Sequence, residues 1–242
     1  MRETLQMSES FKVAVDKAIQ SGHVIRIRAY AVITATETRL NYIVESILKK
    51  FNREDMLAPV YTSVKELSLN GAKANFKRIL FEDENIQSDD DIEYERGVKL
   101  FKERLNEGWV LESGKKARER KMHVDIYFDF DTDRLLVEVV NNRPISQKED
   151  KRIREKFLAA RRYDDIAQFY LEGGDSSEGA GMGIVLVTMM LKAQGIDPHL
   201  FTIRSDYREK TLARVEFPIS PDYRPQREKF IVGASAESVL SV

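Results

Sequence analysis

The sequence contains no cysteine, which excludes disulfide bonds, thiolate chemistry and cysteine-ligated zinc. Its three histidines, His23, His123 and His199, include no pair at the i, i+4 spacing of a helical metal site. The chain also begins without an apolar signal core, and its longest apolar run, residues 184–191, is far shorter than the roughly 20 residues that cross a bilayer. We therefore expect a soluble, cytoplasmic protein with no membrane partner and no histidine-bound catalytic metal.

An excess of charge of either sign is also missing. The 39 Lys and Arg residues face 40 Asp and Glu residues, which leaves a formal net charge of −1. This balance argues against a nucleic-acid partner, because such partners are attracted by an excess of positive charge. With 242 residues, of which 42% are hydrophobic, the chain is long enough to bury a substantial core.

Hydrophobic periodicity predicts both strands and helices. Alternating apolar and polar residues predict strands at 23–30, 122–130, 135–140, 200–205 and 211–217. Helical patterns cover residues 36–50, 60–81, 92–105, 147–170 and 184–194. Strands paired as hairpins, with helices between them, predict an α+β fold: a two-layer α/β sandwich whose mixed, mostly antiparallel sheet carries helices on one face.

The same pattern suggests how the chain is organised. Residues 1–59 form an N-terminal extension of strand and helix that packs on the same core, and residues 60–218 form the main domain. An inserted region at about 82–121 begins with an acidic run and ends with a basic stretch, both of which are expected at the solvated surface. Residues 219–242 are expected to form a C-terminal tail.

Glycine is concentrated in one segment. Five of the 12 glycines lie between residues 173 and 183, and Gly179, Gly181 and Gly183 alternate with Ala180 and Met182 directly before an apolar helix. Such glycines let backbone amides approach a phosphate, and a helix N-terminus adds partial positive charge. The alternative is a surface loop. Neither a P-loop nor a dinucleotide fingerprint fits this spacing.

Polar side chains recur along one line of the helix at 60–81. Glu66, Asn70, Lys73 and Lys77 are spaced i, i+4, i+7 and i+11, so they form one narrow stripe. A carboxylate, an amide and two amines in register are suited to a base, a Mg²⁺ ligand and phosphate contacts, because Mg²⁺ usually takes few protein oxygens. A solvated helix face accounts for the stripe equally well.

Taken together, four motifs resemble the Bergerat-type ATP-binding fold of the GHKL superfamily, which gyrase, heat-shock chaperones, histidine kinases and mismatch-repair ATPases share. Residues 66–74 (ELSLNGAKA) resemble its N box, and residues 179–184 (GAGMGI) resemble its second glycine box. Residues 166–170 (IAQFY) resemble the F box of histidine kinases, and residues 211–218 (TLARVEFP) resemble the closing strand. The histidine kinases are the most similar subgroup.

The resemblance implies Mg·ATP as the ligand, with ATP and Mg²⁺ as cofactors. It implies that Asn70 ligates the metal, that Glu66 is the general base or orients the attacking group, and that Lys73 contacts phosphate. The glycine box (Gly179, Gly181, Met182 and Gly183) would hold the triphosphate, while Asn141 and Thr211 would meet adenine. The activity implied is phosphoryl transfer or ATP hydrolysis in signalling, with a further protein as partner.

The first glycine box departs from the family pattern. The family reads D-x-G-x-G, whereas this chain has Asn141-Asn142-Arg143-Pro144-Ile145, which lacks both the carboxylate and the glycines. No upstream phosphoacceptor motif is present either, since His23 begins a predicted strand. A second hypothesis therefore stays open: a degenerate member of the superfamily that binds a partner protein with little or no nucleotide turnover.

Overall fold

The computed structural model describes residues 7–163, 169 and 182–225. Most of the helices and strands occur in separate groups along the chain, as expected of an α+β protein. They are α1 (Glu9–Gln20), β1 (Ile25–Ala29), α2 (Thr34–Lys50), η1 (Glu54–Met56), α3 (Leu57–Asp83), α4 (Asp91–Arg104), α5 (Glu107–Glu119), β2 (Val124–Phe130), β3 (Arg134–Asn141), α6 (Gln147–Arg162), α8 (Met182–Ala193), η2 (Pro198–Leu200), β4 (Phe201–Ser205) and β5 (Thr211–Pro218).

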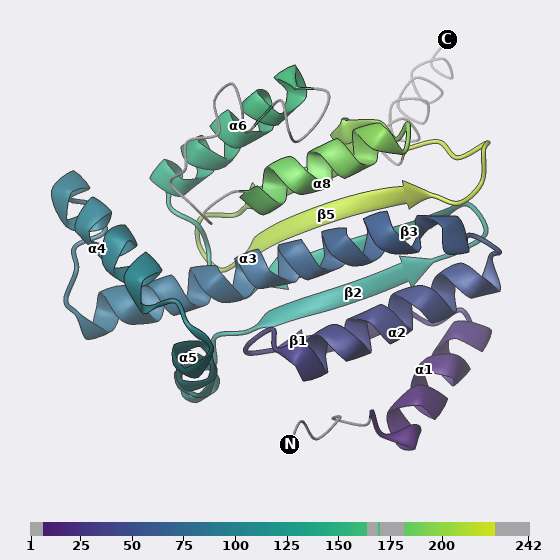
Figure 1. The fold of residues 1–242 in the computed structure, drawn as a ribbon, viewed down its shortest axis with the longest axis horizontal. Helices are drawn as coiled ribbons and strands as arrows, with labels where there is room; N and C mark the ends of the chain where they lie inside the picture. The colour runs from purple at the N-terminus through teal and green to yellow at the C-terminus, as the bar shows by residue number, and fades with distance from the viewer. Residues whose placement is uncertain (1–6, 164–168, 170–181, 226–242) are drawn as a thin grey trace, which may run out of the picture.

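The described strands form one five-stranded sheet in the order β1-β2-β3-β5-β4 (Figure 1). All four pairs of neighbours are antiparallel, so the expectation of a mixed sheet is wrong for these strands. The pairs β2–β3 and β4–β5 are hairpins. In the pairs β1–β2 and β3–β5, helical segments separate the two strands in the sequence. In this register Asn141 lies between Val124 and Thr211.

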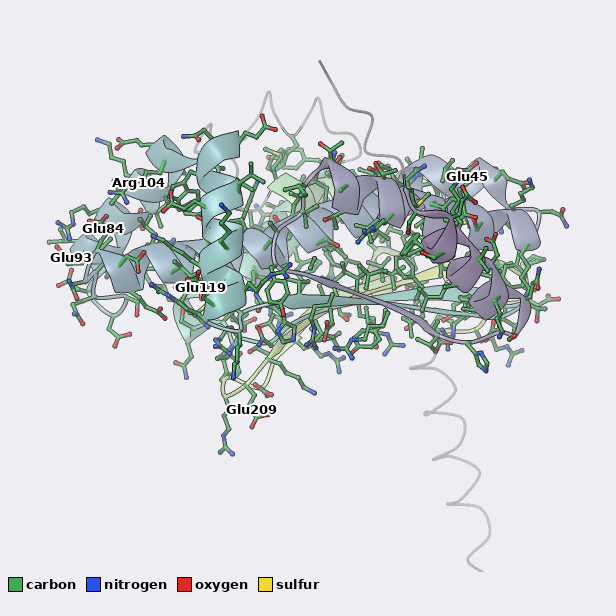
Figure 2. All side chains as sticks on the ribbon, turned by 90° about the horizontal axis from the view of Figure 1, so that it is seen from below. Glu45, Glu84, Glu93, Arg104, Glu119 and Glu209 are labelled. Carbon is green, nitrogen blue, oxygen red and sulfur yellow. The ribbon has the colours of Figure 1, made fainter. Side chains whose placement is uncertain are left out.

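The two faces of the sheet differ in chemistry. Along β2, Val124, Ile126 and Phe128 are fully buried and belong to the main core, whereas Asp125 and Tyr127 alternate with them on the opposite face. Figure 2 shows that the helices of the described residues lie on one side of the sheet. The two-layer sandwich with helices on one face is therefore confirmed. Side chains on the helix-covered face pack against α3 and its neighbours, and those on the other face, such as Asp125 and Tyr127, are polar.

Helix α3 is the centre of the helical layer. It has 27 residues and lies between α2 and α8 (Figure 1). Its residues Val60, Val64 and Leu67 are buried in the main core. Gly71 brings α3 close to the sheet, because a Cβ at this position would lie 2.9 Å from Val124 Cγ2.

The inserted region contains two helices. Helix α4 was expected, but α5 was not, and α3 continues to Asp83, beyond the expected start of the insertion. Trp109 of α5 makes edge-to-face contacts with Phe76 of α3 and Phe101 of α4, with ring centroids 6.0 and 5.6 Å apart. At its outer end, Glu84 pairs with Arg104 at 2.7 Å (Figure 2). The insertion thus packs on the second half of α3.

Other boundaries also differ from the expectation. The sequence did not indicate α1, and α6 ends at Arg162 and not at residue 170, with Tyr163 already in extended conformation. Ile219, which was expected to begin a tail, is 8% exposed and belongs to the main core. Arg53 fixes it, because its guanidinium donates a 2.6 Å hydrogen bond to the Ile219 carbonyl.

Candidate nucleotide site

The start of α8 lies against the polar stripe of α3. An ideal Cβ on Gly183 would be 2.7 Å from Asn70 Nδ2 and 2.8 Å from Glu66 Oε2, so only glycine fits without displacing these side chains. Glu66 and Asn70 are both half-buried. The structure therefore brings Gly183, in the described part of the motif at 179–184, against the motif at 66–74, although more than a hundred residues separate them in the sequence.

The rest of the glycine cluster is outside the residues that the structure describes. Gly179 and Gly181 are among these, as are four of the five residues at 166–170. Phe169 is described and is buried at 5% exposure, with its ring 5.4 Å from the ring of Tyr163. Met182 begins α8 and is half-buried beside this aromatic pair.

Asn141 ends β3 on the face that the helices cover. Its Nδ2 donates a 3.0 Å hydrogen bond to the Gly71 carbonyl of α3. Because a carbonyl can only accept, this bond sets the orientation of the amide group. The Oδ1 atom of Asn141 is left buried without a hydrogen-bond partner among the described residues. A buried acceptor without a partner costs about 1–3 kcal/mol, which a ligand donor would recover.

Thr211 does not present a free hydroxyl to the site. Its Oγ1 donates to the Arg143 carbonyl at 3.0 Å and lies 3.4 Å from Ser205 Oγ. The threonine that the resemblance places next to adenine therefore holds the loop after β3. Its contribution to a ligand is indirect, through the position of that loop.

Hydrogen bonds fix the loop after β3, which stands where the family has its first glycine box. Arg78 of α3 donates to the Pro144 carbonyl at 2.6 Å, and the Asn142 Oδ1 accepts from the His123 amide at 2.7 Å. The loop then enters α6 through a capping box, in which Ser146 and Glu149 satisfy each other's backbone amides. A loop that is fixed at both ends and in the middle is preorganised, so it does not need flexible glycines to keep its shape.

A cavity of about 410 Å³ opens between this loop, α3 and the insertion. This volume lies in the range of small-molecule sites. Asn141, Arg143 and Pro144 form one wall. Asn75 of α3 forms another, and its Oδ1 is also buried without a partner among the described residues. Two of the residues that line this cavity thus carry a buried amide oxygen without a partner, which favours a ligand whose hydrogen-bond donors could reach these oxygens.

One end of the cavity contains a buried ion pair. Lys77 Nζ lies 2.5 Å from Glu149 Oε1 and 3.1 Å from the Tyr94 hydroxyl, and both charged side chains are about one-fifth exposed. Burial opposes the charged form of both groups, but their mutual attraction prevails: the pKa of Lys77 is raised and that of Glu149 is lowered. Lys77 is therefore neutralised by Glu149 and is not available as a free phosphate contact.

Lys73 is the remaining cation of the stripe. It is half-buried on α3, between Asn70 and Lys77, and the described part of the chain shows no ion pair or hydrogen bond for its side chain. It is thus the amine of this stripe that remains available to an anionic ligand.

Sequence reasoning missed three residues of this cavity: Asn75, Tyr94 and Glu149. Asn75 lies off the polar stripe, and Tyr94 and Glu149 reach Lys77 across 17 and 72 residues of sequence. Such contacts have no local signature. The capping box that places Glu149 was a readable signal, since Ser146 and Glu149 have the S-x-x-E spacing.

The donor set for a metal is small. The described residues include no group of three or more His, Asp or Glu side chains that would hold a metal ion by themselves. Glu66 and Asn70, which both lie next to Gly183, offer one carboxylate and one amide. This set fits Mg²⁺, which commonly takes one or two protein ligands and completes its shell with water and phosphate oxygens.

Comparisons with known proteins leave the family open. No family model matches the chain, and no solved structure matches it. A protein of Treponema pallidum (strain Nichols), described as uncharacterized, is 27% identical over 215 residues. The match covers 89% of this chain but only 42% of the relative, so the chain spans less than half of that protein's length. None of the described helices is long and apolar enough to cross a membrane.

Proposed function

We propose that this chain binds Mg·ATP as a member of the histidine-kinase-like group of the GHKL superfamily, with the base in the cavity between α3 and the loop after β3 and the phosphates beside it, where α3 meets the start of α8. The observation that carries the proposal is Asn141: it lines a cavity of about 410 Å³, and its buried Oδ1 has no partner among the described residues. The cytoplasmic location and the role in signalling remain predictions from the sequence.

The orientation of Asn141 supports adenine as the base. The Gly71 carbonyl holds Nδ2, so the amide offers its oxygen as an acceptor. Adenine carries an exocyclic amine at the corresponding edge, whereas guanine carries an oxygen. An acceptor that faces an acceptor loses the hydrogen bond and leaves both groups desolvated. The site should therefore prefer ATP to GTP although it lacks the family's carboxylate.

The contact between α8 and α3 supports the position of the phosphates. Asn70 would hold the metal through its side-chain oxygen, and the metal would neutralise the charge on the phosphates. Glu66 lies beside Asn70 and would orient or deprotonate the attacking group. Lys73 and the N-terminus of α8 would bind phosphate oxygens. In this arrangement the chain contributes mainly positioning and charge stabilisation, which phosphoryl transfer requires.

A second candidate function is a partner-binding module without turnover. It is favoured by the neutralised Lys77 and by the loop in which Arg143 and Ile145 stand at the glycine positions of the family pattern. In this case the charged insertion and the open sheet face are the surfaces for a protein partner. The cavity beside Asn141 argues for nucleotide binding, because these substitutions have not filled it.

Calorimetric titration with Mg·ATP and Mg·GTP tests the proposal. We expect the protein to bind ATP more tightly than GTP. Asn70→Ala should weaken ATP binding at least tenfold and leave the fold intact, since alanine is the better helix former. Asn41→Ala is the matched control, because Asn41 is also a half-buried helical asparagine, on α2. Absence of binding of either nucleotide at millimolar concentration would refute the proposal and favour the partner-binding module.

A further inference from the structure

A second cavity, of about 430 Å³, lies behind the loop that follows Asn141. Its walls are the end of β3 at Val140, the loop at residues 142–144, and the turn between β4 and β5 at residues 208–210. Arg143 and Pro144 line both this cavity and the candidate nucleotide cavity. The loop therefore separates two hollows.

The second cavity is on the side of the sheet away from the helices. Val140 alternates along β3 with Val139 and Asn141, whose side chains face the helical layer. Figure 2 shows Glu209, in the β4–β5 turn, projecting from the sheet on the side opposite the helices. A ligand in this cavity would thus reach the loop from the face that no described helix covers.

The charge of the second cavity is not balanced. Its lining contains three cations, Arg143, Arg208 and Lys210, and one carboxylate, Glu209. Within the described residues, the side chains of Arg208 and Lys210 have no ion pair, and the Arg143 guanidinium donates only to the backbone carbonyls of Asn142 and Arg120. By contrast, Arg26 and Arg28 on the same sheet face are both paired with Asp125.

The turn that carries two of these cations has a well-defined conformation. Asp206 Oδ1 accepts hydrogen bonds from the backbone amides of residues 208, 209 and 210, at 2.8–3.0 Å. These bonds lower the pKa of Asp206 to about 2, so the carboxylate is ionised at any physiological pH and the turn keeps its form. The cations are thus presented from a preorganised backbone.

We propose that this second cavity binds a phosphoryl group. The side chains that line it carry a net charge of about +2, which the neighbouring Asp206 carboxylate, attracted to Lys210, partly offsets; the remaining positive charge attracts the charge of about −1.5 to −2 that a phosphate monoester carries at pH 7. Two arginines and a lysine supply the donors that phosphate oxygens prefer. The volume is sufficient for a phosphorylated side chain or a small phosphorylated metabolite. Both share this chemistry, and the experiment below distinguishes them.

The shared loop couples the second cavity to the first. A phosphoryl group would accept hydrogen bonds from the Arg143 guanidinium. The backbone of the same loop is bonded to the first site's surroundings, because the Arg143 carbonyl accepts from Thr211 and the Pro144 carbonyl accepts from Arg78 of α3. Occupancy of the second cavity should therefore change the affinity of the first. This coupling rests on the proposed function, whereas phosphoryl binding itself does not.

Nuclear magnetic resonance titration of the whole chain with phosphoserine, and with a short peptide containing phosphoserine, tests the proposal. We expect shifts of the backbone amides of residues 207–211 and a dissociation constant of millimolar or below. Arg208→Ala/Lys210→Ala should weaken binding at least tenfold. The control, Lys17→Ala/Lys49→Ala, removes the same charge from exposed sites on α1 and α2 and should change affinity less than twofold, because α1 packs on α2 and on β1, at the sheet edge opposite β4.

The affinities for the two ligands distinguish the source of the phosphoryl group, and a variant of the nucleotide site separates the two proposals. A peptide that binds at least tenfold more tightly than phosphoserine identifies a phosphorylated partner, and equal affinities identify a small metabolite. Asn70→Ala should leave phosphoserine binding unchanged, so loss of nucleotide binding alone affects only the proposed function and the coupling. Failure of both ligands to bind at 10 millimolar (roughly a 3 kcal/mol interaction), or equal weakening by the control, overturns the phosphoryl site.

Discussion

Gly183→Ala should separate nucleotide binding from folding. The new Cβ would lie 2.7 Å from Asn70 Nδ2 and 2.8 Å from Glu66 Oε2. Both atoms are the ends of flexible side chains, so the contact is relieved by moving these side chains and not the backbone. Alanine contributes up to about 1 kcal/mol of helix propensity, and overpacking costs about 1–3 kcal/mol. The net loss of stability is therefore between zero and about 3 kcal/mol.

The effect on binding should be larger. Displacement of Asn70 removes the proposed metal ligand, and an interaction of this kind with a charged group contributes about 1.5–3 kcal/mol. At 1.4 kcal/mol per tenfold change, the dissociation constant for Mg·ATP should rise by roughly 10- to 150-fold. The protein should remain folded throughout.

Calorimetry with Mg·ATP, together with thermal unfolding, measures both quantities. Gly108→Ala is the matched control, since Gly108 is likewise the second residue of its helix, α5, and its Cβ would meet nothing closer than Asn106 Oδ1 at 3.5 Å. The control should retain full affinity and be slightly more stable. If folded Gly183→Ala binds Mg·ATP within twofold of the wild-type protein, the contact between α8 and α3 does not form the phosphate site.

Two further predictions concern stability. Asn141→Asp replaces the donor that faces the Gly71 carbonyl with a carboxylate oxygen, so the free energy of unfolding should fall by about 1–3 kcal/mol; an unchanged melting temperature would contradict the assigned amide orientation. Glu149→Gln leaves the Lys77 ammonium without its counter-charge and should cost about 3 kcal/mol at pH 7. Because the folded-state pKa of Glu149 is lowered, its contribution is complete above its ordinary value of 4.5 and is lost as pH falls through the lowered pKa. Urea unfolding should therefore show a smaller loss of stability on acidification for the variant than for the wild type, and parallel curves would refute the pairing.

Local sequence patterns predicted most of the fold because each pattern reports the burial of one side of one element. The alternation at residues 124–130 follows from a strand with one face in the core, and the period of residues 60–81 follows from a helix between two neighbours. The short amphipathic helices α1 and α5 were missed, although Ser8 and Asn106 are their N-caps, because one cap without a long periodic run is a weak signal.

The sequence by itself determined the α+β class, the sheet's two faces and the pairing of Glu66 with Asn70 on one side of a helix, since these depend on spacing within single elements. Only the tertiary structure decided that Gly183 meets that pair, that Glu149 neutralises Lys77, and that Asn141 keeps an acceptor without a partner. These features depend on contacts between residues far apart in the chain. Their geometry is determined by how closely α3, α8 and the sheet pack, and no local pattern of residues encodes that packing.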